Sequence, residues 1–162
     1  MLTCVVHNYN RAHYIEKCLE SILFQKTKYK FVIIVVDDCS TDNSKQIVEK
    51  IKNKYSASNL YFFSTKKNTG LGRNAIIDLY PQIKKFFNSK YLYRIDSDDY
   101  LIDFKKFEKQ ITFLESRPDC IGICHPCKVF NEKDNSFEQG YHSHVGVFTA
   151  EELIKHLVNG GS

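Results

Sequence analysis

The chain has 162 residues, of which 43% are hydrophobic and 26% are charged. This size and composition fit one domain around a single core, and they exclude a disordered, collagen-like or low-complexity protein. No stretch approaches the roughly 20 apolar residues of a membrane-spanning helix, and no signal peptide pattern precedes the first apolar run. We therefore expect a soluble, cytoplasmic protein.

The net charge of +4 comes from scattered lysines rather than from one basic block, which is typical of a solvated surface. We expect no nucleic acid partner, because zinc-finger spacing, aromatic strings and arginine-rich tracts are missing. Four residues of types that bind zinc lie close together in the sequence: Cys120, Cys124, His125 and Cys127. They fall in one apolar run without the paired spacing of zinc knuckles, so we expect buried thiols of a strand rather than a zinc site.

Hydrophobic periodicity divides the chain into alternating strands and helices. A strand at 2–6 precedes a helix at 12–25, a strand at 31–36 precedes a helix at 45–54, and a strand at 59–64 precedes a helix at 75–89. A strand at 91–95 precedes a helix at 104–118, and a strand at 120–130 follows. Pro81 should kink or split the third helix. A final helix should begin after Thr149 as its N-cap and end before Gly160.

Strands that alternate with helices in this way predict an α/β fold with a mostly parallel, doubly wound sheet and helices on both faces. Such sheets bind ligands at the carboxyl ends of their strands. Polar clusters follow four of the expected strands: HNYN at 7–10, DDCSTD at 37–42, NTGLGRN at 68–74 and DSDD at 96–99. We expect these four clusters to converge on one crevice.

The DSDD cluster places Asp96, Asp98 and Asp99 directly after a buried strand. Carboxylates this close repel one another, and a hard cation such as Mg2+ or Mn2+ would relieve the repulsion while keeping positions open for phosphate oxygens. The alternative is an acidic turn before the next helix, whose N-cap Asp103 could supply alone. The additional acids favour the metal site.

The other clusters contain both capping and binding candidates. Thr41 or Asp42 could cap the helix that follows them, whereas Asp38 stands where an acid can accept hydrogen bonds from a base or a ribose. The glycine-bearing loop lacks the defining residues of dinucleotide-binding and P-loop motifs. Arg73 in this loop could pair with a diphosphate or with neighbouring carboxylates.

The four clusters, in this order, resemble the signature of family-2 glycosyltransferases of the GT-A fold. The matching segments are HNYN, VVDDCSTDNS, NTG with the Arg73-Asn74 pair, and RIDSDDYL. The resemblance covers about the first hundred residues and implies a GT-A, Rossmann-like domain. It also implies that the chain corresponds to the amino-terminal, nucleotide-sugar-binding part of such an enzyme.

The resemblance implies an activity and a set of site residues. A hexosyltransferase of this kind moves a sugar, with inversion, from a nucleoside diphosphate donor, commonly a UDP-sugar, to a glycan or lipid-linked acceptor, and uses Mn2+ or Mg2+ at the leaving diphosphate. The residues that match nucleotide-sugar-binding positions are His7, Tyr9, Asn10, Asp38, Arg73, Asp96 and Asp98. The metal-binding positions are Asp98 and Asp99.

The chain also departs from the family's pattern. His7-Asn8 replaces a segment with proline, Cys39 replaces a glycine at a position that often has positive φ, and the loop between Gly70 and Arg73 is short. The family's general base lies well beyond the DxD motif, so we expect residues 1–162 to form a single GT-A-like domain without the acceptor-binding portion and its base.

Three alternatives remain open. His142 and His144 could act as a base or as metal ligands, or they could be surface histidines of a hairpin. The chain could bind a nucleotide-sugar and metal without transferring anything. A nucleotidyltransferase is a third possibility, but its glycine-rich, lysine-bearing loop is missing.

The basic surface would suit peripheral contact with anionic lipids at the inner membrane face.

Overall fold

The computed structural model describes residues 1–70, 72–123, 125 and 127–139. The chain divides into two compact units, residues 1–109 and 110–162, which are described separately below. The expected final helix, with Thr149 and Gly160, and both His142 and His144 lie outside the described residues. Among the described residues, no helix has both the length and the apolar composition needed to cross a membrane. The single-domain organisation stays a prediction.

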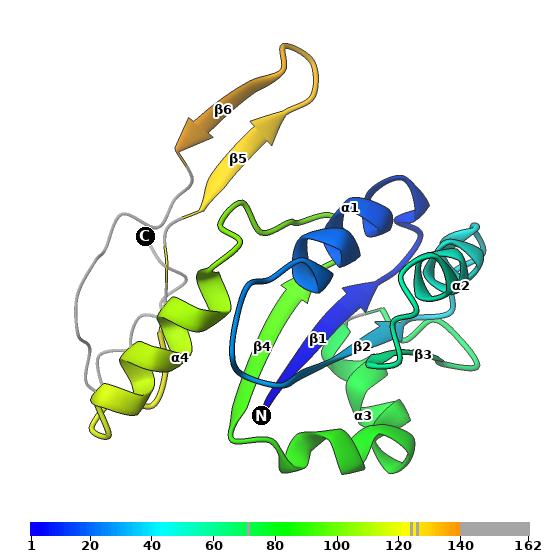
Figure 1. Ribbon diagram of the computed structural model, residues 1–162. Helices are drawn as coiled ribbons and strands as arrows, with labels where there is room; N and C mark the ends of the chain where they lie inside the picture. Colours follow the sequence, from blue (N-terminus) through cyan, green and yellow to red (C-terminus); the bar gives the residue numbers. More distant parts are fainter. Residues whose placement is uncertain (71, 124, 126, 140–162) are drawn as a thin grey trace. The chain divides into compact units, whose positions relative to one another are not determined.

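The first unit contains a four-stranded sheet in which every strand pair is parallel (Figure 1). Its strands are β1 (Leu2–Asn8), β2 (Phe31–Asp37), β3 (Leu60–Ser64) and β4 (Tyr91–Asp96), in the order β3-β2-β1-β4. The central strands β1 and β2 are buried along almost their whole length, which is why their sequences are continuous apolar runs. The strand order changes direction between β1 and β4, where α/β sheets usually bind ligands.

Helices cover both faces of this sheet. The helices α1 (Ala12–Leu23) and α2 (Ser44–Lys54) lie side by side on one face, whereas α3 (Gly72–Ile83) packs on β2 from the other (Figure 1). Pro81 lies inside α3, which ends two residues later at Ile83, and the chain continues as the 3-10 helix η1 (Lys84–Asn88). The predicted interruption of this helix is therefore confirmed. The helix α4 (Lys106–Ser116) follows β4.

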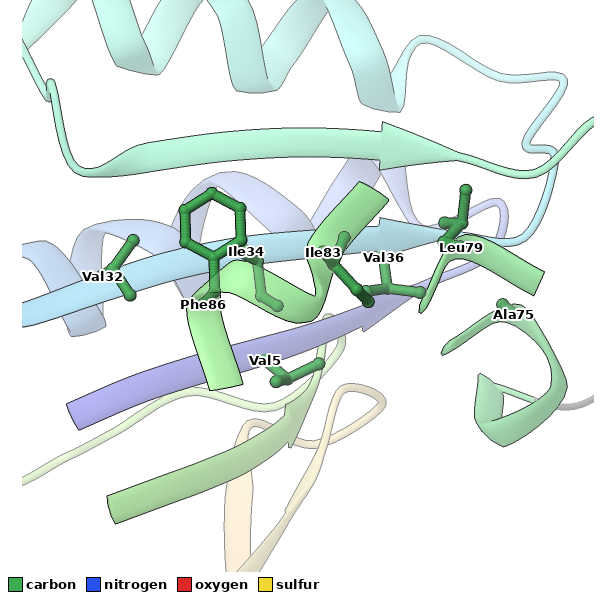
Figure 2. Close-up of a cluster of buried hydrophobic side chains, with 8 residues drawn as sticks. All are labelled: Val5, Val32, Ile34, Val36, Ala75, Leu79, Ile83 and Phe86. Atoms are coloured by element: carbon green, nitrogen blue, oxygen red, sulfur yellow. The ribbon is translucent and has the colours of Figure 1, made fainter. Parts of the chain in front are cut away.

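The α3 side of the sheet contains a compact hydrophobic cluster (Figure 2). Its members come from β1, β2, α3 and η1, and they are Val5, Val32, Ile34, Val36, Ala75, Leu79, Ile83 and Phe86. Alternate residues of β2 contribute to this cluster, so Ile33 and Val35 between them face α1 and α2. A central strand that buries both faces between helices confirms the predicted α/β fold.

The second unit differs from the prediction. Its described strands are β5 (Lys128–Asn131) and β6 (Ser136–Gln139), which pair as an antiparallel hairpin. The predicted strand at 120–130 is wrong over most of its length, because none of the described residues from 120 to 127 belongs to a strand. Gly122 and Pro126 interrupt this apolar run in the sequence, and both residue types disfavour strand interiors.

The exposure of this segment also corrects the prediction of buried thiols. Ile121 is 80% exposed, Cys120 is half-buried and Cys127 is exposed. Cys124 lies outside the described residues. Since an apolar run buries its side chains only where another element covers it, the composition of this run alone was a poor guide to its burial.

Candidate functional site

The carboxyl ends of the parallel strands lie level with one another at one edge of the sheet. His7 of β1 is in register with Asp96 of β4, and Asn8 is in register with Asp37 of β2. Asp37 is in turn in register with Ser64, the last residue of β3. The polar clusters that follow the strands therefore begin at the same edge, as the sequence predicts.

A buried polar network ties these strand ends together. The Asn8 amide donates from Nδ2 to Asp37 Oδ1 at 2.7 Å and to Ser40 Oγ at 3.1 Å, and its Oδ1 accepts from Ser97 Oγ at 2.8 Å. The Asp37 carboxylate is 2% exposed and also accepts from Ser64 Oγ at 2.8 Å. Because each of these side chains has a hydrogen-bond partner, the network fixes the relative positions of β1, β2, β3 and β4.

Three carboxylates surround this network on the solvent side. Ser97 is buried, whereas Asp96, Asp98 and Asp99 around it are exposed. Partial desolvation of the carboxyl group, followed by repulsion from Asp98 and Asp96, raises the pKa of Asp99 above its ordinary value, and Lys106 opposes this shift. The carboxylates thus repel one another, and hard oxygen ligands of this kind fit a divalent cation.

Asp96, Asp98 and Asp99 do not form a complete metal-binding site by themselves. Within the part of the chain that the structure describes, no three His, Cys, Asp or Glu side chains are grouped as a metal site. A cation would therefore have one or two carboxylate ligands from this cluster, which is the usual arrangement where phosphate oxygens and water complete the coordination of Mg2+.

Two arginines that the sequence-based prediction did not include pair with these acids. Arg11 donates from Nε to Asp98 Oδ2 at 2.9 Å, and the Arg94 guanidinium lies 3.6 Å from Asp96 Oδ1. Arg11 directly follows the HNYN cluster. A positively charged side chain beside a polar cluster was therefore the sequence signal that could have identified Arg11.

Asp38 directly follows β2, as predicted, and its oxygens contact the loop after β3. The side chain is 4% exposed and accepts from the backbone amides of Thr69 at 2.8 Å and Gly70 at 3.1 Å. It also accepts from Thr65 Oγ1 at 3.3 Å. Gly70 has a φ of 81°, which suits a glycine. Asp38 therefore fixes the loop that leads to α3.

His7 is buried against the start of α3. The residue is 7% exposed, and among the described residues neither ring nitrogen has a hydrogen-bond partner. A Cβ atom at Gly72 would lie 2.6 Å from His7 Nδ1. Burial, followed by the charge of Arg94, lowers the pKa of His7, while Asp96 and the nearby backbone of Gly72 act in the opposite direction. The neutral ring offers one donor and one acceptor nitrogen.

The remaining predicted residues lie near the same strand ends. Tyr9 follows β1 and is 46% exposed, whereas the Asn10 side chain is engaged with the loop after β2, since its Oδ1 accepts from the Thr41 amide at 2.8 Å. Cys39 has a φ of 62°, so the conformation for which the family uses glycine is kept with a side chain present. Arg73 is exposed in the first turn of α3.

Asp42 connects the first residues of two helices. Its Oδ1 accepts from the Ser44 amide at 3.0 Å, and its Oδ2 accepts from the Ala12 amide at 2.8 Å. Asn43, rather than Thr41 or Asp42, occupies the N-cap position of α2. Burial by itself would raise the pKa of Asp42, but hydrogen bonds from the Ser44 hydroxyl and from the Ala12 and Ser44 amides lower it overall.

Similar proteins are found among glycosyltransferases. A glycosyltransferase of unknown role from Mycoplasma genitalium is 31% identical over 96% of this chain and 49% of its own length. The teichoic acid poly(glycerol phosphate) polymerase of Staphylococcus epidermidis is 32% identical over 94% of this chain and 20% of its own length. The chain thus spans half or less of the length of these relatives.

Two solved structures are also similar to this chain. Staphylococcus aureus TarS in complex with UDP has a TM-score of 0.58 and 29% identity, over 81% of this chain and 39% of that chain. The Pyrobaculum calidifontis mannosyltransferase PcManGT, in complex with GDP-Man and Mn2+, has a TM-score of 0.60 over 74% of this chain and 33% of that chain, and at 20% identity it shows a common fold only. The sequence model described as glycosyl transferase family 2 matches residues 3–157. The chain therefore belongs to glycosyltransferase family 2 and has its GT-A fold.

Proposed function

We propose that this chain is the donor-binding part of a metal-dependent, inverting glycosyltransferase that uses a nucleoside diphosphate sugar. The observation that carries the proposal is the cluster of Asp96, Asp98 and Asp99 at the end of β4, in register with the end of β1 at His7. These groups lie at the position of the sheet where α/β folds usually bind nucleotides.

Asp98 and Asp99 are the proposed ligands of Mn2+ or Mg2+. The bound cation would neutralise negative charge on the departing nucleoside diphosphate. Asp96 is proposed to accept a hydrogen bond from the donor ribose, because its side chain is 55% exposed at the same edge. One or two carboxylate ligands leave coordination positions for the phosphate oxygens.

The proposed nucleobase side of the site contains His7 and Tyr9. Buried polar groups are costly when unpaired, so a base that pairs with His7 would be favoured, and the exposed ring of Tyr9 offers a surface for stacking. Asp38 and Asn10 are proposed to contribute here while they hold the adjoining loops. Arg73 is proposed to pair with the diphosphate from the start of α3.

Similarity to TarS supports a UDP-sugar as the donor, because TarS is solved with UDP and with UDP-GlcNAc. A glycan or a lipid-linked glycan is the proposed acceptor. Two relatives, named a teichoic acid poly(glycerol phosphate) polymerase and a poly(ribitol-phosphate) beta-N-acetylglucosaminyltransferase, support a role in polymer synthesis. Peripheral binding to the inner membrane face is proposed on the scattered lysines. Flotation with anionic vesicles tests this binding, and a chain that stays unbound contradicts it.

Calorimetric titration of UDP, GDP and CMP, with and without Mn2+, tests the donor site. We expect a diphosphate nucleotide to bind in the presence of Mn2+, and Asp98→Ala to weaken this binding by at least about tenfold because a metal ligand is lost. Asp78→Ala is the matched control, since Asp78 is an exposed carboxylate of α3. A folded chain that binds none of these nucleotides would contradict the proposal. Sugar transfer to candidate acceptors separates an enzyme from a binding module.

A further inference from the structure

Arg11 has a fixed backbone and an exposed side chain. The residue before it is held by Asn10 N donating to Ser40 Oγ at 2.9 Å, and the residue after it by Ala12 N donating to Asp42 Oδ2 at 2.8 Å. The Arg11 side chain itself is 49% exposed. A long side chain on an anchored backbone can change its partner without any change in the fold.

In the described structure, the Arg11 side chain is paired with a carboxylate oxygen of Asp98 that a metal ion would need as a ligand. Arg11 Nε lies 2.9 Å from Asp98 Oδ2, and the Asp98 side chain is 42% exposed. A guanidinium and a divalent cation repel each other and compete for the same carboxylate lone pairs. An ion pair this exposed contributes little net stability, so a cation at Asp98 would displace Arg11 readily.

The displaced guanidinium would lie beside the diphosphate that the metal binds. Its planar array of N–H donors matches phosphate oxygens as well as it matches a carboxylate. We propose that Arg11 is a positioning residue with two partners: Asp98 when the metal is absent, and the donor diphosphate when the metal is bound. This inference rests on the proposed function of the site.

A double-mutant cycle on nucleotide binding without metal tests the exchange of partners. The variants are Asp98→Ala, Arg11→Gln and the double variant, each titrated with UDP in EDTA and followed by NMR, which measures weak binding. Removing Asp98 should free Arg11 for the diphosphate and tighten UDP binding by about fivefold. In the Arg11→Gln background the same change should have less than about a twofold effect, because no guanidinium is released.

Equal tightening in both backgrounds would overturn the inference, since loss of a negative charge alone acts independently of Arg11. Arg94→Gln is the matched control, because Arg94 pairs with Asp96 at 3.6 Å, and its cycle with Asp98→Ala should be additive. Titration of the unchanged chain with UDP and GDP in Mn2+ separates the two proposals. If UDP or GDP binds in Mn2+ but the Arg11 and Asp98 substitutions act additively, only the role of Arg11 is contradicted. If neither nucleotide binds, both the donor site and the role of Arg11 are contradicted.

Discussion

Gly72 lies against the imidazole of His7, and this contact makes the role of His7 testable without altering His7. A Cβ atom at position 72 would lie 2.6 Å from Nδ1, so Gly72→Ala should displace the buried ring. If His7 binds the nucleobase, we expect this substitution to weaken nucleotide binding by about tenfold through loss of one hydrogen bond to a buried group. Calorimetry in Mn2+ measures the effect.

Gly122→Ala is the control for this substitution. A Cβ atom at Gly122 would meet nothing within 4 Å, so we expect unchanged nucleotide affinity. If Gly72→Ala binds nucleotide as the unchanged chain does and His7→Ala does as well, His7 has no part in donor binding.

At the scale of single residues, the sequence predicted that polar clusters follow the strand ends, but it did not predict the hydrogen bonds within and between these clusters. The position of the DSDD acids could be predicted because the cluster directly follows an apolar run typical of a strand. The hydrogen bonds of Asn8 and Asp37 could not, since a buried hydrogen-bonded polar residue looks like any polar residue until its partners are known. Arg11 was missed because its partner, Asp98, lies 87 positions away in the chain.

At the scale of elements, Asp42 joins the starts of α1 and α2 with one carboxylate. A negative charge at a helix N-terminus is favourable, and here it acts on two helices. We expect Asp42→Ala to lower the free energy of unfolding by about 1–2 kcal/mol at neutral pH, because hydrogen bonds to the first amides of two helices are lost. Urea denaturation followed by circular dichroism measures the change.

The contribution of Asp42 should depend on pH. Its pKa is lowered in the folded state, so its stabilisation is present above the ordinary carboxyl pKa of about 3.9 and is lost as the pH falls toward the folded value. The difference between Asp42→Ala and the unchanged chain should therefore shrink in acid. Asp78→Ala should stay within about 0.5 kcal/mol throughout, and an equal loss in that variant would contradict a specific role for Asp42.

The sequence predicted elements well where local pattern and packing agree. β-branched runs in β1 and β2 and the helical periodicity of α1 and α2 gave the correct elements in the correct order. The segment before β5 has apolar residues as well, but Ile121 is 80% exposed there. Periodicity reports which face an element could bury, and it carries no information about whether another element covers that face.

At the scale of the whole molecule, His7 should make stability depend on pH near neutrality. Burial, followed by the charge of Arg94, lowers its pKa in the folded state, whereas the unfolded chain has the ordinary value of about 6.5. The unfolded state therefore binds more protons below that pH, and the free energy of unfolding should fall as the pH decreases from about 6.5.

Urea denaturation between pH 7.5 and 5 measures this dependence on the unchanged chain and on His7→Gln, which cannot titrate there. We expect a smaller slope of unfolding free energy against pH in the variant. Parallel slopes would show that other groups cause the dependence. At lower pH, the hydrogen bonds from Tyr55 and then Lys54 that lower the pKa of Glu20 should add a second loss, in both proteins.

The parallel order of the sheet has a consequence for synthesis of the chain on the ribosome. β1 is made before the other three strands of the sheet, yet it is a central strand whose second neighbour is β4, which begins at residue 91. Until then, one side of β1 has no strand to pair with, and its backbone and apolar residues are open to other chains. Completion of the sheet must therefore wait until β4 has left the ribosomal tunnel, so a nascent chain of this topology is a natural client for chaperones.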